Sequence, residues 1–105
     1  ILALPRRAAI NLHDGPLPEY AGLNTPVWAL LNGERNHGIS WHLMTDRVDE
    51  GAVLVERRFP ITAGETALTL NTKCFEAAIE GFDELIRGLA DGSLRPREQG
   101  QAPQR

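Results

Sequence analysis

The chain has 105 residues, 42% of them hydrophobic, and carries a formal net charge of -3. This length bounds it to one domain with a modest core. Its Lys and Arg residues are scattered and do not outnumber the acidic residues, which argues against a nucleic-acid-binding surface. The composition favours a small-molecule partner.

A single cysteine excludes an internal disulfide and a cysteine-based zinc cluster, and it agrees with a reducing, cytoplasmic setting. No apolar run approaches the about 18 residues that suggest a membrane span, so we expect no membrane partner. The chain begins with Ile1 rather than Met and shows no signal-peptide pattern. We therefore expect it to be a piece of a longer cytoplasmic protein.

The first expected elements are a strand and a helix joined by a stiffened loop. Residues 8–12 are almost continuously apolar and predict a short buried strand, and residues 13–24 form a loop with two prolines and two glycines. A helix then begins at Thr25, which we expect to act as its N-cap, with Pro26 in the first position. The pair at 32–33, Asn-Gly, predicts its end.

Two strands and a long helix follow. Residues 38–44 alternate between apolar and polar side chains, and residues 52–59 read as a second strand. An amphipathic helix is predicted from near Thr66 to just before Gly92. Its apolar stripe consists of Leu70, Cys74, Ala77, Ala78, Phe82, Leu85, Ile86 and Leu89.

The order strand, helix, strand, strand, long helix predicts an α/β or α+β layer. Three strands make a thin sheet, so we expect further strands before Ile1. Residues 93–105 have almost no apolar content and are predicted to be a linker or a disordered tail.

Asn11 and His13 stand two positions apart where the first strand ends. In extended chain their side chains point to the same side, so an amide and an imidazole could together stabilise a developing oxyanion. The alternative is structural, because asparagine often bonds its own loop and a lone loop histidine is more often structural than catalytic. Spacing alone leaves both interpretations open.

The polar loop between the last two strands offers Asp46 and Asp49, either of which could orient the imidazole of His13. Spacing does not choose between them. No histidine pair has metal-ligand spacing, so no metal site is expected. His42 is expected to be packed in its strand, and His37 to be solvated in a turn.

Three further side chains are interpreted as structural. Trp28 and Trp41 stand at apolar positions of their elements, so both are expected in the core. Cys74 falls on the apolar stripe of the long helix and is expected to be an inert, buried thiol.

The run "INLHDGPLPEYAGLNTPVWALLNGERNHGISWHLMTDRVDEGAVL" resembles the 10-formyltetrahydrofolate-dependent formyltransferases. That family includes glycinamide ribonucleotide, methionyl-tRNA and UDP-amino-sugar formyltransferases, and the formyltetrahydrofolate hydrolases. The resemblance covers residues 8–90. It implies a partial Rossmann-like formyltransferase domain in which residues 1–92 are the C-terminal half of the catalytic domain. The chain alone is then expected to be inactive.

The resemblance also implies roles for particular residues. Asn11 and His13 match the family's catalytic Asn and His, and Asp49, in "VDEG", matches its catalytic Asp. The donor implied is 10-formyltetrahydrofolate. Part of its binding surface would come from the loop before that Asp, namely Thr45, Asp46, Arg47 and Val48.

One position departs from the family pattern. Gly15 stands where the family carries Ser, which leaves the substrate side open. The motif sequences are similar to those of formyltransferase domains attached to peptide-synthetase-like assembly lines. The amine acceptor is therefore expected to be a small molecule or carrier-bound, and the tail at 93–105 would suit a linker to a further biosynthetic domain.

The implied reaction is acyl transfer from the folate to a primary amine, with Asn11 and protonated His13 stabilising the oxyanion and Asp49 keeping His13 charged. Two alternatives remain open. A hydrolase would use the same residues with water as the nucleophile. A non-catalytic or degenerate fragment would use none of them.

Overall fold

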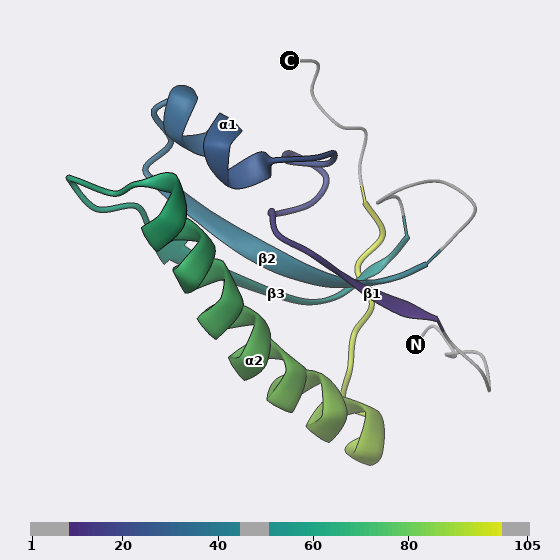
Figure 1. Ribbon diagram of the computed structural model, residues 1–105. Coiled ribbons are helices and arrows are strands. Elements are labelled where there is room, and N and C mark those ends of the chain that lie inside the picture. Colours follow the sequence, from purple (N-terminus) through teal and green to yellow (C-terminus); the bar gives the residue numbers. More distant parts are fainter. Residues whose placement is uncertain (1–8, 45–50, 100–105) are drawn as a thin grey trace.

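The computed structural model describes residues 9–44 and 51–99 (Figure 1). Within them lies a three-stranded antiparallel sheet in the order β1-β2-β3, with one short and one long helix, as the α/β interpretation expected. The elements are β1 (Ile10–His13), α1 (Thr25–Leu31), β2 (Asn36–Leu43), β3 (Val53–Pro60) and α2 (Ala67–Asp91). The long helix α2 lies across one face of the sheet (Figure 1).

The central strand β2 begins earlier than the expected start at residue 38. Asn36 pairs with Pro60 and His37 pairs with Phe59, which extends the ladder into the predicted turn. Gly38 permits this pairing, because a Cβ at this position would lie 2.4 Å from the carbonyl oxygen of Arg57. This stretch is polar, so the sequence did not predict that it belongs to the strand, although its backbone packs closely against β3.

His37 was expected to be solvated, and this expectation was wrong. Its side chain is completely buried, and its Nε2–H donates to the carbonyl oxygen of Asp14 at 2.8 Å. The ring packs edge-on against Tyr20 and Phe59, with centroid distances of 5.6 and 6.2 Å. Burial lowers the pKa of His37 below its ordinary value, against the opposing effect of Asp14.

The start of α1 also differs from the expectation. Asn24, in the left-handed region with φ of 58°, occupies the N-cap position, whereas the hydroxyl of Thr25 donates to the carbonyl of Asp14. The helix ends as predicted, at Asn32 followed by a left-handed glycine. Trp28 was expected in the core, but 51% of it is exposed in the described structure.

The helix α2 has the predicted limits. Thr66 caps it in a reciprocal capping box with Thr69, and Gly92 ends it with φ of 70°. Cys74 is buried as expected, and burial raises the pKa of its thiol to about 12.

The face of α2 that contacts the sheet is rotated away from the predicted stripe. Phe82, Ile86 and Leu89 were expected to be buried but are 40–48% exposed. Gly81 explains the rotation, because a Cβ at this position would lie only 3.2 Å from the indole of Trp41. The buried side of the helix consists of Leu70, Cys74, Ala77, Ala78, Gly81, Leu85 and Gly88.

The segment after α2 contacts the sheet as far as Gln99. Arg97 and Val53 exchange two backbone hydrogen bonds of 2.8 Å, and the guanidinium of Arg97 donates to the carbonyl of Leu17 at 3.2 Å. The side chain of Gln99 donates to Gly51 O at 2.7 Å. This part of the predicted linker or disordered tail therefore covers one end of β3.

Acid should destabilise the fold through His37. Because the folded-state pKa of His37 lies below its unfolded value of 6.5, its stabilising contribution is complete above that pH and is lost as the pH falls below it. Urea unfolding at a series of pH values should show this loss in the wild type. His37→Gln should be less stable at pH 8 and should show a smaller loss on acidification. An equally steep pH dependence in the variant would contradict this assignment.

Candidate active site

Asn11 and His13 both lie within β1, which runs one residue further than the expected end at residue 12. In the register with β2, Asn11 faces His42 and His13 faces Ser40 across the ladder. The alternation of a strand therefore places these four side chains on one face of the sheet. It is the face opposite to α2, because the alternate residue of β2, Trp41, packs against that helix.

His13 is buried beneath the loop that follows it, whereas Asn11 is exposed. The Nε2–H of His13 donates to the carbonyl oxygen of Tyr20 at 2.5 Å. This bond fixes the orientation of the imidazole ring. The structure thus brings together the two residues that the sequence singled out on β1.

The loop over His13 is held to the sheet by Ser40. The hydroxyl of this buried serine donates to Gly15 O at 2.8 Å and accepts from the backbone N–H of Leu17 at 3.2 Å. Within the loop, the N–H of Tyr20 donates to Pro16 O at 2.8 Å, and the Leu17–Pro18 peptide bond is cis.

Glycine at position 15, where the resemblance implies a Ser, has a physical reason in this chain. A Cβ at this position would lie 2.7 Å from the carbonyl oxygen of Tyr20, the same atom that accepts from His13. A larger residue at position 15 would push this carbonyl away from the imidazole.

His42 is packed, as the sequence analysis expected. It is 2% exposed, and its Nδ1–H donates to Leu43 O at 2.9 Å. It lies opposite Asn11 on the same face as His13. Its position beside both residues could not be found from its sequence context, because the pairing register decides it.

The other predicted site residues lie outside the described ranges: Thr45, Asp46, Arg47, Val48 and Asp49. The two ends of this segment are nevertheless described. Met44 N–H donates to Ala9 O at 2.8 Å, and Leu43 N–H donates to Ala52 O at 2.9 Å. The first end therefore attaches beside the start of β1, and the second end attaches to the last residue of β2.

Gly51 fixes the point at which the chain returns from this segment. A Cβ on Gly51 would lie 1.6 Å from the carbonyl oxygen of Leu43, so only glycine fits. The glycine of the "VDEG" motif thus has a steric role two positions after Asp49. The motif contains this glycine, but its contact with Leu43 depends on the fold and could not be predicted from the sequence.

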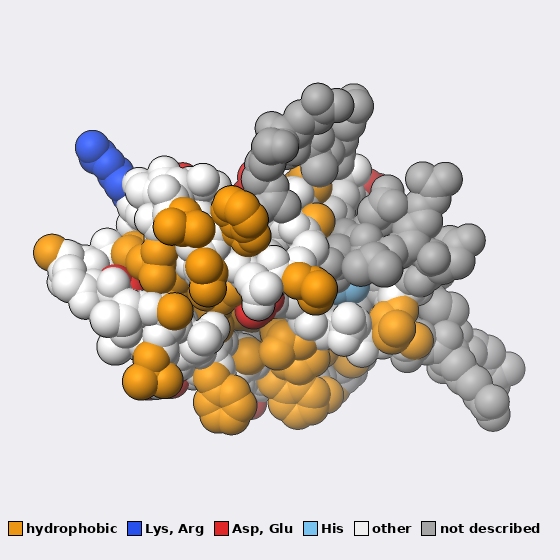
Figure 2. Space-filling model, turned by 45° about the horizontal axis from the view of Figure 1, so that its top comes forward, with side chains coloured by type: hydrophobic (Ala, Val, Ile, Leu, Met, Phe, Trp, Pro, Cys, Tyr) orange, Lys and Arg blue, Asp and Glu red, His pale blue; other side chains and the backbone are white. Residues whose placement is uncertain are grey.

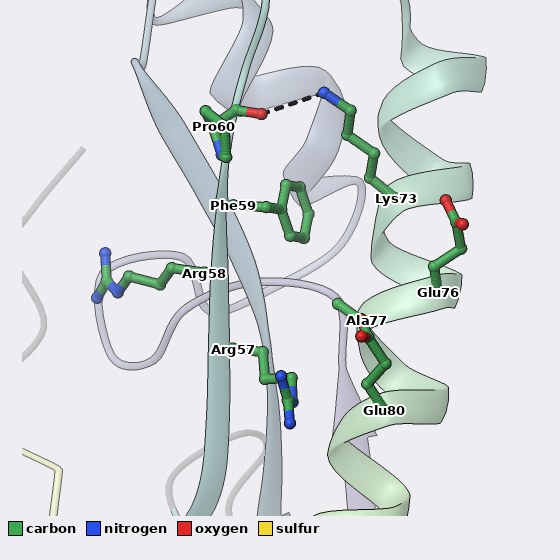
Figure 3. A pocket seen from close by; sticks show the side chains of 8 residues that line it. All are labelled: Arg57, Arg58, Phe59, Pro60, Lys73, Glu76, Ala77 and Glu80. Carbon is green, nitrogen blue, oxygen red and sulfur yellow. Dashed lines mark hydrogen bonds between the residues drawn. The ribbon is translucent and has the colours of Figure 1, made fainter.

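A groove of about 330 Å³ lies between β3 and α2. In Figure 3, Phe59 and Arg57 point toward the helix, and Lys73 donates to the carbonyl of Pro60 at 3.2 Å. On the helix side, the groove is lined by the carboxylates of Glu76 and Glu80 and by the ammonium group of Lys73. The sheet separates this groove from Asn11 and His13, so it does not belong to the candidate site.

Two kinds of feature are absent from the described residues. No three His, Cys, Asp or Glu side chains in 9–44 and 51–99 are grouped so that they could hold a metal ion. None of the helices in these ranges is long and apolar enough to cross a membrane.

Ser40→Ala should lower the free energy of unfolding by about 1–3 kcal/mol, because it leaves a buried donor and a buried acceptor of the loop without their partner. Chemical denaturation measures this change. Thr72→Ala removes an exposed hydroxyl bonded to its own helix and serves as control, with an expected change within about 0.5 kcal/mol. Equal effects of the two substitutions would contradict the role of Ser40.

Gly51→Ala should be more harmful than Gly64→Ala. The first forces a Cβ into the backbone of Leu43, at an expected cost of about 3 kcal/mol or more. The second puts a side chain on a residue with φ of 82° but with open space around it, which should cost about 1–2 kcal/mol. Urea titration of both variants measures the difference, and a reversed order would refute the steric role of Gly51.

Comparisons with known proteins identify the family. A family model described as formyl transferase matches residues 1–86. GDP-perosamine N-formyltransferase of Brucella melitensis is 33% identical over 101 residues, which are 96% of this chain and 39% of that protein. Methionyl-tRNA formyltransferase of Caldanaerobacter subterraneus is 36% identical over 99 residues, covering 94% of this chain and 32% of that protein.

Solved structures agree. The sugar 3N-formyl transferase WlaRD, crystallised with dTDP and 5-N-formyl-THF, superposes with a TM-score of 0.81 at 25% identity. The match covers 91% of this chain and 36% of that one, so the chain spans less than two fifths of each of these relatives. The three-stranded sheet is thus part of a Rossmann-like formyltransferase fold, and the chain belongs to the formyl transferase family.

Proposed function

We propose that the chain is the C-terminal half of a catalytic domain that transfers a formyl group from 10-formyltetrahydrofolate to a primary amine. The observation that carries this proposal is the placement of Asn11 and His13 on one face of β1, with His13 beneath a loop held by Ser40. Membership of the formyl transferase family and the presence of 5-N-formyl-THF in the WlaRD crystal support the choice of donor.

The donor supplies the formyl carbon and a nitrogen leaving group. The amine nitrogen attacks that carbon, the carbonyl oxygen becomes an oxyanion, and the bond from carbon to N10 of the folate then breaks. The amide of Asn11 and the imidazolium of His13 donate hydrogen bonds to the oxyanion. The proton lost by the amine passes to the leaving nitrogen, and no covalent bond to the protein forms.

Asp49 is proposed to orient His13 and to favour its charged form, with Thr45, Asp46, Arg47 and Val48 contributing to the folate surface. The anchoring of this segment to Ala9, beside the start of β1, and to Leu43, at the end of β2, supports the assignment. The choice of Asp49 over Asp46 rests on the resemblance of "VDEG" to the family motif.

The acceptor is proposed to be an amine on a small molecule or on a carrier. The name GDP-perosamine N-formyltransferase supports an acceptor of the first kind. At position 15, glycine provides no side-chain hydroxyl that could contact the acceptor.

His13→Ala and Asn11→Ala should each reduce turnover on the order of 100-fold, because each removes a group that stabilises the oxyanion. Asn36→Ala, an exposed asparagine at the start of β2, is the matched control and should keep full activity. The assay measures release of tetrahydrofolate from 10-formyltetrahydrofolate by the complete polypeptide that the gene encodes. A His13→Ala enzyme with wild-type turnover would contradict the catalytic role proposed for His13.

The same assay, run with and without a panel of amines, distinguishes the alternatives. Release that requires an amine and yields a formylated product supports the transferase. Release without an amine, with free formate as the product, indicates a hydrolase. No release from the wild type under either condition would favour a non-catalytic domain.

A further inference from the structure

Four charged side chains form a continuous ionic network beside the loop that covers His13, residues 14–20, called here the covering loop. Arg97 Nη2 lies 3.2 Å from Glu56 Oε1, and Arg58 Nε lies 2.9 Å from the other oxygen of the same carboxylate. The Nη2 atom of Arg58 lies 2.7 Å from Glu19 Oε2. The ionic network therefore joins three parts of the chain: the segment after α2, the strand β3 and the covering loop.

The register of the sheet explains why the ionic network lies on the side of the candidate site. Glu56 pairs with Ser40 in the ladder between β2 and β3, and Arg58 lies two residues further along β3. Because alternate residues of a strand share a face, both charged side chains lie on the face where Ser40 holds the covering loop. In Figure 3, Arg58 points away from α2, whereas Arg57 points toward this helix.

Arg97 is the member of the ionic network that contacts the backbone of the covering loop. Its Nη2 donates to the carbonyl oxygen of Leu17 at 3.2 Å. Leu17 is completely buried, and its N–H donates to the hydroxyl of Ser40 at 3.2 Å. The backbone of Arg97 is itself fixed, because it exchanges two hydrogen bonds of 2.8 Å with Val53. Two side chains from distant parts of the chain thus hold the N–H and the C=O of one loop residue.

The covering loop transmits this support to His13. Glu19, at the other end of the ionic network, directly precedes Tyr20, whose carbonyl oxygen accepts from His13 Nε2–H at 2.5 Å. The N–H of Tyr20 donates to Pro16 O at 2.8 Å, which closes residues 16–20 into one turn. The ionic network contacts this turn at Leu17 and at Glu19. A displacement of the turn would therefore move the carbonyl that orients the imidazole.

Isolated ion pairs on a protein surface contribute little, because water screens them and both side chains lose conformational freedom. Two features distinguish this ionic network. Two guanidinium groups share the carboxylate of Glu56, whose side chain is only 22% exposed, and one of them also bonds the carbonyl of a buried residue. Charge is also unevenly distributed over the surface, since the face of the molecule in Figure 2 carries mainly hydrophobic side chains and few charged ones.

We propose that Arg97 is a positioning residue for His13. Through the carbonyl of Leu17 and its ion pair with β3, Arg97 holds the covering loop, and the loop fixes the imidazole through the carbonyl of Tyr20. The segment 93–99 is then part of the support of the candidate site. This inference rests on the proposed function, because it takes His13 as a catalytic residue.

Amide hydrogen exchange in the complete polypeptide that the gene encodes tests the proposal. Arg97→Gln removes the charge that joins the segment after α2 to the ionic network. Arg87→Gln is the matched control, because Arg87 pairs with Asp83 on the exposed surface of α2. The amides of Leu17 and Tyr20 should exchange at least about tenfold faster in Arg97→Gln, and at the wild-type rate in Arg87→Gln.

A second measurement follows the imidazole itself. The Nε2–H proton of His13 should be visible by NMR, because its hydrogen bond slows exchange with water, and it is assigned by its absence in His13→Gln. Its resonance should shift or broaden in Arg97→Gln and stay in place in Arg87→Gln. Glu19→Gln, at the other end of the ionic network, should act in the same direction as Arg97→Gln. It supplies a second variant should Arg97→Gln fold poorly.

The formyl-transfer assay connects the ionic network to turnover. Arg97→Gln should lower kcat about tenfold and change KM for the folate by less than about twofold, because the orientation of a catalytic group is altered while the folate surface is kept. Arg87→Gln should change neither constant. Circular dichroism at the assay temperature shows that each variant is folded.

Unchanged amide exchange or an unchanged His13 resonance in Arg97→Gln would overturn the proposal, as would a wild-type kcat in this variant. Equal changes in Arg87→Gln would also overturn it, because they would indicate a general loss of stability. A wild-type polypeptide that transfers no formyl group would refute the proposed function instead. The exchange and NMR measurements would then decide whether Arg97 holds the imidazole of His13.

Discussion

The arrangement of the candidate site depends on one constraint, the satisfaction of backbone polar groups in the buried loop that follows β1. A buried loop must find partners for its N–H and C=O groups, and here side chains of the sheet supply several of them. Ser40 bonds the loop at two points, and His37 donates to the carbonyl of Asp14. Prolines at 16 and 18 have no N–H, so two donors that would need partners are absent. The same loop then presents the carbonyl that orients His13.

Elements governed by local pattern could be predicted from the sequence. The capping threonine, the glycine stop and the apolar period together specify α2, because each acts within one or two turns of the chain. Alternation likewise placed Asn11 and His13 on one side of an extended strand. His37 could not be placed in this way, because its burial depends on pairing with Phe59, a residue 22 positions later, and on the contact of Gly38 with the backbone of β3.

The apolar period of a helix indicates that part of its surface is buried, but it does not identify the element that buries it. Trp28 and Phe82 both occupy apolar positions, and both are about half exposed in the described structure. On α2 the orientation is set by Gly81, which lets the backbone approach Trp41 and turns the larger side chains aside. A glycine contributes almost nothing to a hydrophobic pattern, so the sequence predicted that Phe82, Ile86 and Leu89 face the sheet, whereas all three are partly exposed.

The two faces of the sheet meet in the four residues of β1. Asn11 and His13 point to the face of the candidate site, and Leu12 between them points to the face covered by α2. A short strand with one neighbour is among the least anchored parts of a sheet. Packing against Leu12 would restrict the same backbone that carries the amide and the imidazole. A contact on the α2 face of β1 is therefore expected to order Asn11 and His13 without touching either side chain.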